Sequence, residues 1–243
     1  MTSKEKGTLF VVATPLGNLK DITLRALEVL KSSDRIAAED TRRTQKLLSA
    51  HDLHIPLISF NENNKYRRIP FLLEQLRQGQ QVSLVTDGGT PAISDPGKEL
   101  VREARRAGIA VVPIPGPSAL TCALSASGLP GDAFVFLGFL PRRKSRRKKI
   151  LQEMKEQERT VIIYEAPHRI NALLQEILEV MGDWEVALTR ELTKVHEEIL
   201  VGSLNEVMDR LSGRDPKGEY TVLLAPIPTR PENWNGSTAG PGH

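Results

Sequence analysis

The order of apolar and polar positions predicts alternating strands and helices in the first half of the chain. Residues 8–13 are mostly apolar and β-rich, as expected for a strand buried on both faces. Leu24, Leu27 and Leu30 then recur at helical spacing, in a helix that Asp21 is expected to cap. The same alternation continues, with strands expected at 35–38, 57–60, 82–86 and 109–114 and helices at 41–50, 65–78 and 98–107. This pattern predicts a mainly parallel sheet with helices on both faces.

The second half of the chain has a less regular order of elements. Pro167 is expected to begin a helix whose apolar stripe runs from Ile170 to Met181. A basic helix should end near residue 158, and a short helix is expected at 204–211. Strands are expected at 133–139, 160–165, 184–192, 195–201 and 220–225. The order indicates a smaller domain with a mixed sheet.

A proline-rich segment separates the two patterns. Pro115, Pro117 and Pro130 bracket a short helix that is expected to start at Ser118. We therefore expect an N-terminal α/β domain at 7–117, a linker region at 118–132 and a C-terminal mixed α/β domain at 133–225. Residues 226–243 hold four prolines and three glycines without apolar periodicity, and we expect them to form a disordered tail.

Composition narrows the class of protein. The 243 residues are 40% apolar and 26% charged, which is ordinary globular usage and excludes a collagen-like or largely disordered chain. No apolar run approaches the roughly 18 residues of a membrane helix, and the first residues do not resemble a signal peptide, so we expect a cytoplasmic protein. A single cysteine, Cys122, excludes an internal disulfide framework and a cysteine-cluster zinc site.

The net charge of +3 hides one strongly basic run. Residues 142–149 carry seven positive charges in eight positions, at Arg142, Arg143, Lys144, Arg146, Arg147, Lys148 and Lys149. Cations at a helix N-terminus oppose the helix dipole, so local helix stability does not explain the run. Two interpretations stay open, a solvated face or a phosphate-binding patch for nucleic acid. No aromatic residue is interleaved with the run, so base stacking is not indicated there.

Loops after the strands hold the candidate chemistry, because open α/β sheets bind ligands beyond the carboxyl ends of their strands. Residues 14–20 contain neither a dinucleotide fingerprint nor a P-loop, and an ordinary turn between strand and helix is the favoured interpretation of this loop taken alone. Residues 87–97 are longer than common connections and hold three glycines and two prolines, which permits close approach of the backbone to a ligand. Asp87 could accept hydrogen bonds from ribose hydroxyls or from an amine.

Two further loops have both a structural and a functional interpretation. Ser118 could simply cap a helix, or its hydroxyl and the adjacent backbone amides could bind a carboxylate or ribose. Tyr164, Glu165, His168 and Arg169 lie within six residues at a strand end, which is more than a turn requires.

Taken in order, seven segments resemble one family. They are VVATPLGNL at 11–19, IAAEDTR at 36–42, LVTDGGTPAISDPG at 84–97, PIPGPSA at 113–119, GFLP at 138–141, YEAPHR at 164–169 and RELTK at 190–194. Together they resemble the bacterial small-subunit ribosomal RNA 2′-O-ribose methyltransferase I group of the tetrapyrrole methylase superfamily. The resemblance covers about residues 7–225.

The resemblance implies a two-domain α/β protein, usually a homodimer, with S-adenosylmethionine in the cleft between the domains. It implies methylation of a cytidine ribose 2′-hydroxyl in the decoding region of small-subunit (16S) ribosomal RNA. By motif position, the cofactor pocket would be lined by Pro15, Asp87, Gly88, Gly89, Ile93, Ser118, Ala119 and Tyr164. The family often has Ala-Gly where this chain has Gly88-Gly89, a minor departure.

The candidate residues agree with methyl transfer. S-adenosylmethionine carries its own reactive methyl group, so neither a metal nor a covalent nucleophile is required. His51 and His54 lack an evident third ligand, and no metal site is expected. A ribose hydroxyl needs a proton acceptor, and the sequence does not choose among Glu39, Asp40, Asp95, Glu165 and His168. Besides the basic run, candidates for holding RNA phosphates are Arg42, Arg43, Arg169, Arg190 and Lys194, each of which could instead be solvated or ion-paired.

Two other functions remain open from the sequence. A methylase of the same fold could act on a tetrapyrrole or another small substrate, although the basic run argues against it. A non-catalytic RNA-binding module that keeps the fold is the second alternative, although the intact cofactor loops argue against it.

Overall fold

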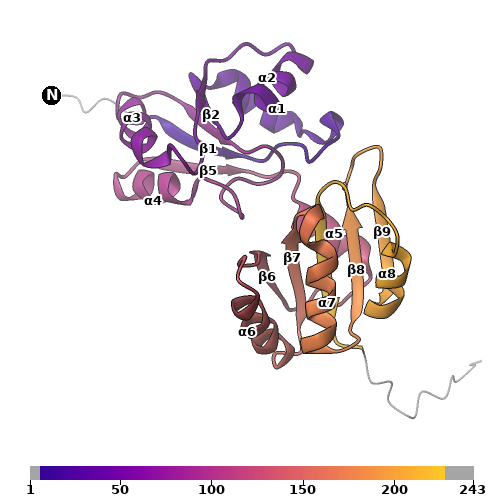
Figure 1. The fold of residues 1–243 in the computed structure, drawn as a ribbon. Coiled ribbons are helices and arrows are strands. Elements are labelled where there is room, and N and C mark those ends of the chain that lie inside the picture. The colour runs from indigo at the N-terminus through magenta and orange to yellow at the C-terminus, as the bar shows by residue number, and fades with distance from the viewer. Residues whose placement is uncertain (1–5, 228–243) are drawn as a thin grey trace, which may run out of the picture.

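A computed structural model describes residues 6–227 of the chain as two five-stranded sheets, each with its own helices (Figure 1). Of the segment expected to be a disordered tail, 226–243, all but the first two residues lie outside the described part. No helix within residues 6–227 is both long enough and apolar enough to cross a membrane.

The first sheet is entirely parallel, which confirms the predicted class. Its strands are β1 (Thr8–Val12), β2 (Arg35–Ala38), β3 (Leu57–Ser59), β4 (Val82–Val85) and β5 (Ala110–Ile114). They lie in the order β3-β2-β4-β1-β5, so β1 pairs with β4 on one side and with β5 on the other. Because all five strands run the same way, the loops that follow them emerge at one edge of the sheet.

Helices cover both faces of this sheet. They are α1 (Leu24–Ser32), α2 (Thr41–Ala50), α3 (Lys65–Arg77) and α4 (Lys98–Arg106), with a 3₁₀ turn, η1 (Leu19–Asp21), before α1. Alternate residues of β4 point to opposite faces: Leu84 packs in the cluster with α3 and α4, and Val85 packs in the cluster with α1 and α2. The predicted cap of α1 was wrong. Thr23 caps the helix by accepting a hydrogen bond from the Ala26 amide, because Asp21 is taken up in the 3₁₀ turn.

The second sheet is mixed. Its strands are β6 (Phe134–Phe139), β7 (Thr160–Glu165), β8 (Glu185–Arg190), β9 (Glu198–Ser203) and β10 (Tyr220–Ala225). They lie in the order β6-β7-β10-β8-β9, in which only the β6–β7 pair is parallel. This antiparallel pairing places the start of β10 beside the end of β7.

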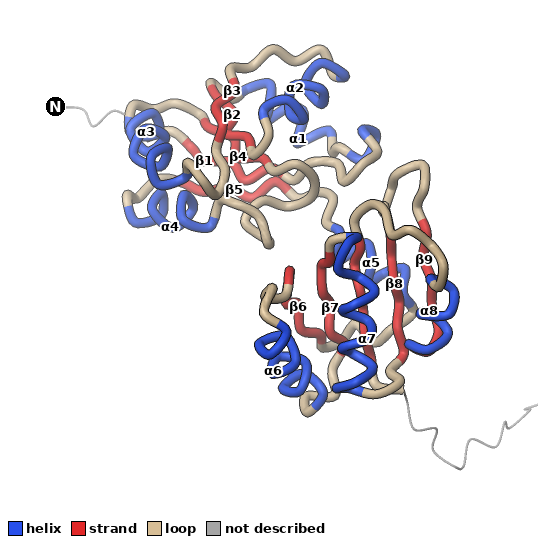
Figure 2. Tube along the Cα trace, viewed as in Figure 1, coloured by secondary structure: helices blue, strands red, loops and turns tan. Residues whose placement is uncertain are grey.

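Helices also cover both faces of the second sheet (Figure 2). They are α5 (Ala119–Ser127), α6 (Lys144–Lys155), α7 (Ile170–Met181), with its leading 3₁₀ turn η2 (Pro167–Arg169), and α8 (Leu204–Leu211). Val161 and Ile163 of β7 pack with α6, α7 and α8, whereas Ile162 packs on the opposite face with Ala123 of α5. The helix between the two sheets thus packs against the second one.

One predicted strand boundary is corrected by the structure. We expected strands at 184–192 and 195–201, but a loop occupies residues 191–197 between β8 and β9. Glu191 and Thr193 adopt positive φ angles of 51° and 66°, which is incompatible with a strand. The Lys194 amide donates to the Glu191 carbonyl and closes a turn.

Candidate functional site

A cavity of about 400 Å³ lies between the two sheets. The first sheet lines it through the loops that follow β1, β2, β4 and β5, and the second through the ends of β6 and β7 and the start of β10. Its lining comprises Leu16, Glu39, Arg43, Thr86, Asp87, Gly88, Gly89, Thr90, Ile93, Asp95, Ser118, Ala119, Phe139, Tyr164, Glu165, Ala166, Pro167, Glu219, Tyr220 and Thr221. Its size is that of a typical small-ligand site.

Backbone hydrogen bonds hold the loops of the first sheet together around the cavity. Thr14 and Gly89 exchange two amide–carbonyl hydrogen bonds of 2.8 and 2.9 Å. Gly89 has φ +94°, and a Cβ on Gly88 would lie 3.1 Å from the carbonyl oxygen of Pro15. The Thr90 hydroxyl donates to the Pro117 carbonyl. The two glycines therefore allow a close backbone approach that larger residues would strain.

Carboxylates gather on the wall formed by the loops after β2 and β4. The Thr86 hydroxyl donates to Glu39 Oε2 at 2.6 Å, next to Asp87 and Asp95. Burial raises the pKa of the Asp95 carboxyl to about 6, and the charges of Glu39, Asp87 and Glu219 add to the shift. Asp95 is therefore a carboxyl group that titrates near neutral pH.

Asp87 links this wall to the start of α2. Its Oδ1 accepts a hydrogen bond from the Asp40 amide at 2.9 Å, and its Oδ2 lies 3.6 Å from Arg43 Nε. Burial and the neighbouring carboxylates of Glu39 and Asp40 raise the pKa of Asp87, although the Asp40 amide and Arg43 oppose this. Asp87 and Arg43 both line the cavity.

Aromatic rings form the opposite wall, at the ends of β6 and β7. Tyr164 packs edge-on between Phe136 and Phe139, with ring centroids 4.9 and 5.8 Å away. Burial raises the pKa of the Tyr164 hydroxyl to about 12, so the phenol stays protonated and can donate a hydrogen bond. Phe139 lines the cavity and is 56% exposed, so part of its ring is accessible to a ligand.

The structure brings most of the predicted cofactor residues together. Those that line the cavity are Asp87, Gly88, Gly89, Ile93, Ser118, Ala119 and Tyr164. Pro15 does not line it, but its carbonyl packs behind Gly88. Ser118 occupies the cap position of α5 without a side-chain capping hydrogen bond. Its hydroxyl is therefore not used by the helix in the way that the structural interpretation expected.

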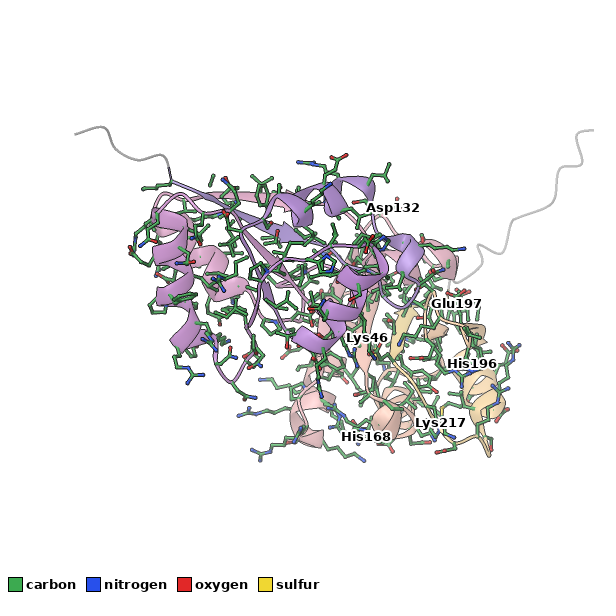
Figure 3. The ribbon with its side chains drawn as sticks, turned by 90° about the horizontal axis from the view of Figure 1, so that it is seen from above. Lys46, Asp132, His168, His196, Glu197 and Lys217 are labelled. Atoms are coloured by element: carbon green, nitrogen blue, oxygen red, sulfur yellow. The ribbon has the colours of Figure 1, made fainter. Side chains whose placement is uncertain are left out.

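The five candidate proton acceptors fall into three environments. Glu39, Asp95 and Glu165 line the cavity. Asp40 instead caps α2 and forms an ion pair with Arg42, whose hydrogen bonds hold the pKa of the Asp40 carboxyl well below its usual range. His168, labelled in Figure 3, lines a neighbouring cavity.

Ion pairs occupy the candidate RNA-binding residues outside the basic run. Arg42 pairs with Asp40, and Arg43 lines the cavity beside Asp87. The remaining pairs are Arg169 with Glu165, Arg190 with Glu198, and Lys194 with both Glu191 and Glu219.

The basic run divides into two sets in the structure. Glu176 of α7 binds Arg147, and Glu179 of α7 lies within 4.0 Å of Lys144 and 2.7 Å of Lys148. These three cations join α6 to α7. Arg142, Arg143, Arg146 and Lys149 are exposed, and only Lys149 of these has an ion-pair partner in the described chain, Glu153 at 4.0 Å. The glutamates of α7 therefore explain why three of the seven cations at residues 142–149 are present, which the stability of α6 alone does not.

Nine residues of the cavity were not among the predicted site residues, and Phe139 and Glu219 are two of them. Phe139 lies in the GFLP segment at the end of a predicted strand, and that position could have indicated a place in the ligand site. Glu219 gave no signal, because only the antiparallel pairing of β10 with β7 brings it to the cavity. Among residues 6–227, no group of three or more histidine, cysteine, aspartate or glutamate side chains is arranged to hold a metal ion.

Comparison with known proteins places this architecture in a family. The description "Tetrapyrrole (Corrin/Porphyrin) Methylases" matches residues 8–208. The chain belongs to the tetrapyrrole methylase family. Among solved methylase structures, the methyltransferase CobJ superposes with a TM-score of 0.68 at 17% identity, covering 91% of this chain and 95% of that one. A uroporphyrin-III-C-methyltransferase from Thermus thermophilus gives a TM-score of 0.61 at 21% identity, covering 90% and 94%.

Several sequence relatives of this tetrapyrrole methylase carry the name "Ribosomal RNA small subunit methyltransferase I". The one from Thermotoga maritima is 48% identical over 219 residues, which cover 90% of this chain and 98% of the relative. The one from Halalkalibacterium halodurans is 48% identical over 220 residues, covering 90% and 76%. The one from Bacillus subtilis is 44% identical over 220 residues, covering 90% and 75%.

Proposed function

We propose that this tetrapyrrole methylase is an S-adenosylmethionine-dependent methyltransferase of small-subunit ribosomal RNA, and that it methylates the ribose 2′-hydroxyl of a cytidine. One observation carries the proposal: a single cavity combines the glycine loop at Gly88 and Gly89 with a carboxyl group, Asp95, that titrates near neutral pH. The names of relatives that are 44–48% identical over 90% of the chain support the RNA substrate.

The residues of the cavity fit a cationic cofactor. S-adenosylmethionine, when bound, supplies a methyl group on a positively charged sulfur, ready for transfer to a nucleophile. Five carboxyl groups line the cavity, and four of them act on one another through their charges, at Glu39, Asp87, Asp95 and Glu219. Their combined negative charge would favour a bound cation. Gly88 and Gly89 leave the loop backbone open for contact, and Ser118, Ala119 and Ile93 would complete the cofactor site.

Asp95 is our choice of proton acceptor for the ribose hydroxyl. A general base works best when its pKa lies near the working pH, and the pKa of Asp95 is about 6. The hydrogen bonds from Arg42 hold the pKa of the Asp40 carboxyl well below its usual range, which weakens it as a base. Glu165 is engaged in an ion pair with Arg169. Glu39 accepts a hydrogen bond from the Thr86 hydroxyl and acts on Asp95 through its charge, as a positioning residue.

The aromatic wall would orient the nucleotide. The exposed ring of Phe139 would offer a stacking surface for the target base, because every nucleobase has a flat π-face. Tyr164, protonated because burial raises its pKa to about 12, supplies a neutral hydrogen-bond donor in the same cavity. Holding base and ribose in one orientation contributes to rate by positioning the hydroxyl for in-line attack.

We also propose the domain division 7–117 and 133–225 with residues 118–132 as the connection, a cytoplasmic location, and a homodimer as the working form. The division is supported by the separate cores of the two sheets, with α5 of the connection packed on the second.

The test is transfer of labelled methyl groups from S-adenosylmethionine to small ribosomal subunits that lack the modification, followed by digestion to nucleosides. The expected result is label in 2′-O-methylcytidine. Label in a base, or in no RNA nucleoside while calorimetry shows normal cofactor binding, would overturn the proposed substrate. Absence of cofactor binding would favour the non-catalytic RNA-binding module instead.

A further inference from the structure

A second cavity of about 460 Å³ adjoins the first. It lies at the starts of α6 and α7, on the second sheet's side of the molecule. Its lining comprises Arg142, Arg147, Glu165, His168, Arg169, Ala172 and Leu173. Glu165 lines both cavities. A ligand that extends out of the first cavity can therefore reach the second.

The second cavity carries more positive than negative charge. Arg147 is paired with Glu176, and Arg169 is paired with Glu165, so these four charges cancel. Arg142 remains, and within the described chain it has no carboxylate partner, unlike Lys144, Arg147, Lys148 and Lys149 of the same run. The exposed imidazole of His168 adds a hydrogen-bond donor. One net positive charge with extra donors suits one singly charged anion.

The backbone between the two cavities is fixed in place. Arg147 donates to the carbonyls of Pro141 and Arg142, and Arg169 donates to the carbonyl of Leu140. This segment directly follows Phe139, which lines the first cavity. The backbone from Leu140 to Arg142 is therefore held by two guanidinium groups that are themselves paired with buried carboxylates.

We propose that the second cavity binds one phosphodiester of the RNA substrate, adjacent to the nucleotide whose ribose enters the first cavity. The inference rests on the proposed function. Each ribose in an RNA strand is flanked by phosphates, so a nucleotide stacked on Phe139 brings a phosphate to a neighbouring position. Arginine is well suited to phosphate oxygens because its planar guanidinium donates two parallel hydrogen bonds. No aromatic ring other than the His168 imidazole lines this cavity, and its charged lining suits a phosphate more than a base.

The test compares two arginines of the same exposed run. Arg142 lines the cavity, whereas Arg146 does not. Binding of a small-subunit RNA fragment that contains the methylated nucleotide is measured for the unaltered protein, Arg142→Ala and Arg146→Ala over a range of salt concentrations. We expect Arg142→Ala to weaken RNA binding about tenfold and to lower the salt slope by about 0.7, the loss of one phosphate contact, with a smaller effect from Arg146→Ala. Affinity for S-adenosylmethionine should not change.

Neutral methylphosphonate linkages placed one at a time along the fragment identify the phosphate. We expect one position next to the target nucleotide to weaken binding of the unaltered protein and of Arg146→Ala, but not of Arg142→Ala. Equal losses from both arginine variants, with no position that distinguishes them, would overturn the phosphate site while methyl transfer by the unaltered protein still stands. If the unaltered protein neither binds nor methylates small-subunit RNA, the proposed function fails, and the RNA phosphate site fails with it.

Discussion

Arg147 and Glu176 form a bidentate ion pair between α6 and α7, with Nε 2.8 Å from Oε2 and Nη2 2.6 Å from Oε1. Their side chains are only 11% and 4% exposed. The same guanidinium also donates hydrogen bonds to the backbone carbonyls of Pro141 and Arg142. It therefore binds the Glu176 carboxylate and the loop before α6 at the same time. One arginine thereby couples helix packing to the shape of the loop between the two cavities.

Arg147→Met should destabilise the fold, because it leaves the Glu176 carboxylate buried without its partner. Breaking a buried pair from one side costs about 3–5 kcal/mol of unfolding free energy. Urea unfolding followed by circular dichroism measures the loss. Arg146→Met, at an exposed site of the same helix, serves as the matched control and should change stability little.

The double variant Arg147→Met/Glu176→Leu should recover most of the lost stability, since an apolar pair replaces a buried ionic one. If the double variant recovers stability but not RNA binding, the role of Arg147 in helix packing is separate from its role in holding the loop at residues 141–142. A loss for Arg147→Met no larger than that for Arg146→Met would contradict the role of this pair.

Asp95 should govern the acid side of the pH profile of methyl transfer. Its pKa is about 6, and only the ionised carboxylate accepts a proton, so kcat/KM should rise with pH below 6 and level off above it. Asp95→Asn should lower kcat by about 100-fold or more and should flatten that acid limb, while cofactor binding persists. Rates measured from pH 5 to pH 9 test this. An unchanged limb in the variant would assign the titration to another group.

The same substitution should stabilise the fold at neutral pH. Folding raises the pKa of Asp95 from 3.8 to about 6, so its stabilising contribution is present below the unfolded value and is lost as pH rises through the folded one. Above pH 6 the folded state holds an unfavourable charge that Asn lacks. Because the group is partly exposed, we expect a gain of about 1 kcal/mol at pH 8 and none at pH 4. Equal effects at both pH values would contradict this linkage.

Sequence pattern predicted the first sheet well because its inner strands β2 and β4 are buried on both faces and its helices are amphipathic. β2 and α2 have the predicted bounds, as does α8 in the second half of the chain. The prediction failed where local backbone conformation overrode residue type, as at the positive φ angles of Glu191 and Thr193. The cap of α1 failed for a related reason, because two polar residues, Asp21 and Thr23, competed for one position.

The candidate site was predictable wherever its residues lie in loops after parallel strands, since those loops meet at one edge. Gly88, Gly89 and Asp95 are of this kind. Glu219 was not predictable, because it precedes its strand and arrives by antiparallel pairing. Nor could the sequence show which cations of residues 142–149 bind α7, since that depends on Glu176 and Glu179, more than twenty residues later.

Gly89→Ala should weaken cofactor binding and stability together. Gly89 has φ +94° within the two hydrogen bonds that it shares with Thr14, a conformation that costs a residue with a Cβ about 1–2 kcal/mol. Gly131→Ala is the matched control, because an added Cβ there meets Leu124 at an ordinary 3.8 Å. Calorimetric titration with S-adenosylmethionine and thermal unfolding measure both effects. Equal behaviour of the two variants would mean that the loop accepts alanine by shifting.

Phe139→Ala should raise the KM for RNA without changing cofactor affinity or fold. The ring is 56% exposed, so its removal leaves only a small cavity beside Tyr164. Stacking of one base on an aromatic side chain contributes about 1–3 kcal/mol, which corresponds to about a fivefold to a hundredfold loss in RNA binding. Phe139→Trp keeps a flat ring and should retain most of the affinity, whereas Phe139→Leu keeps apolar area without a π-face and should not.

The comparison of tryptophan with leucine at residue 139 is decisive because both are apolar but only one stacks. A substrate with an abasic target nucleotide gives the reciprocal measurement. If Phe139 stacks on the target base, the unaltered protein should lose affinity for the abasic RNA, and Phe139→Ala should lose little more. If Phe139 only packs against Tyr164, the two losses should add, and leucine should replace phenylalanine as well as tryptophan does.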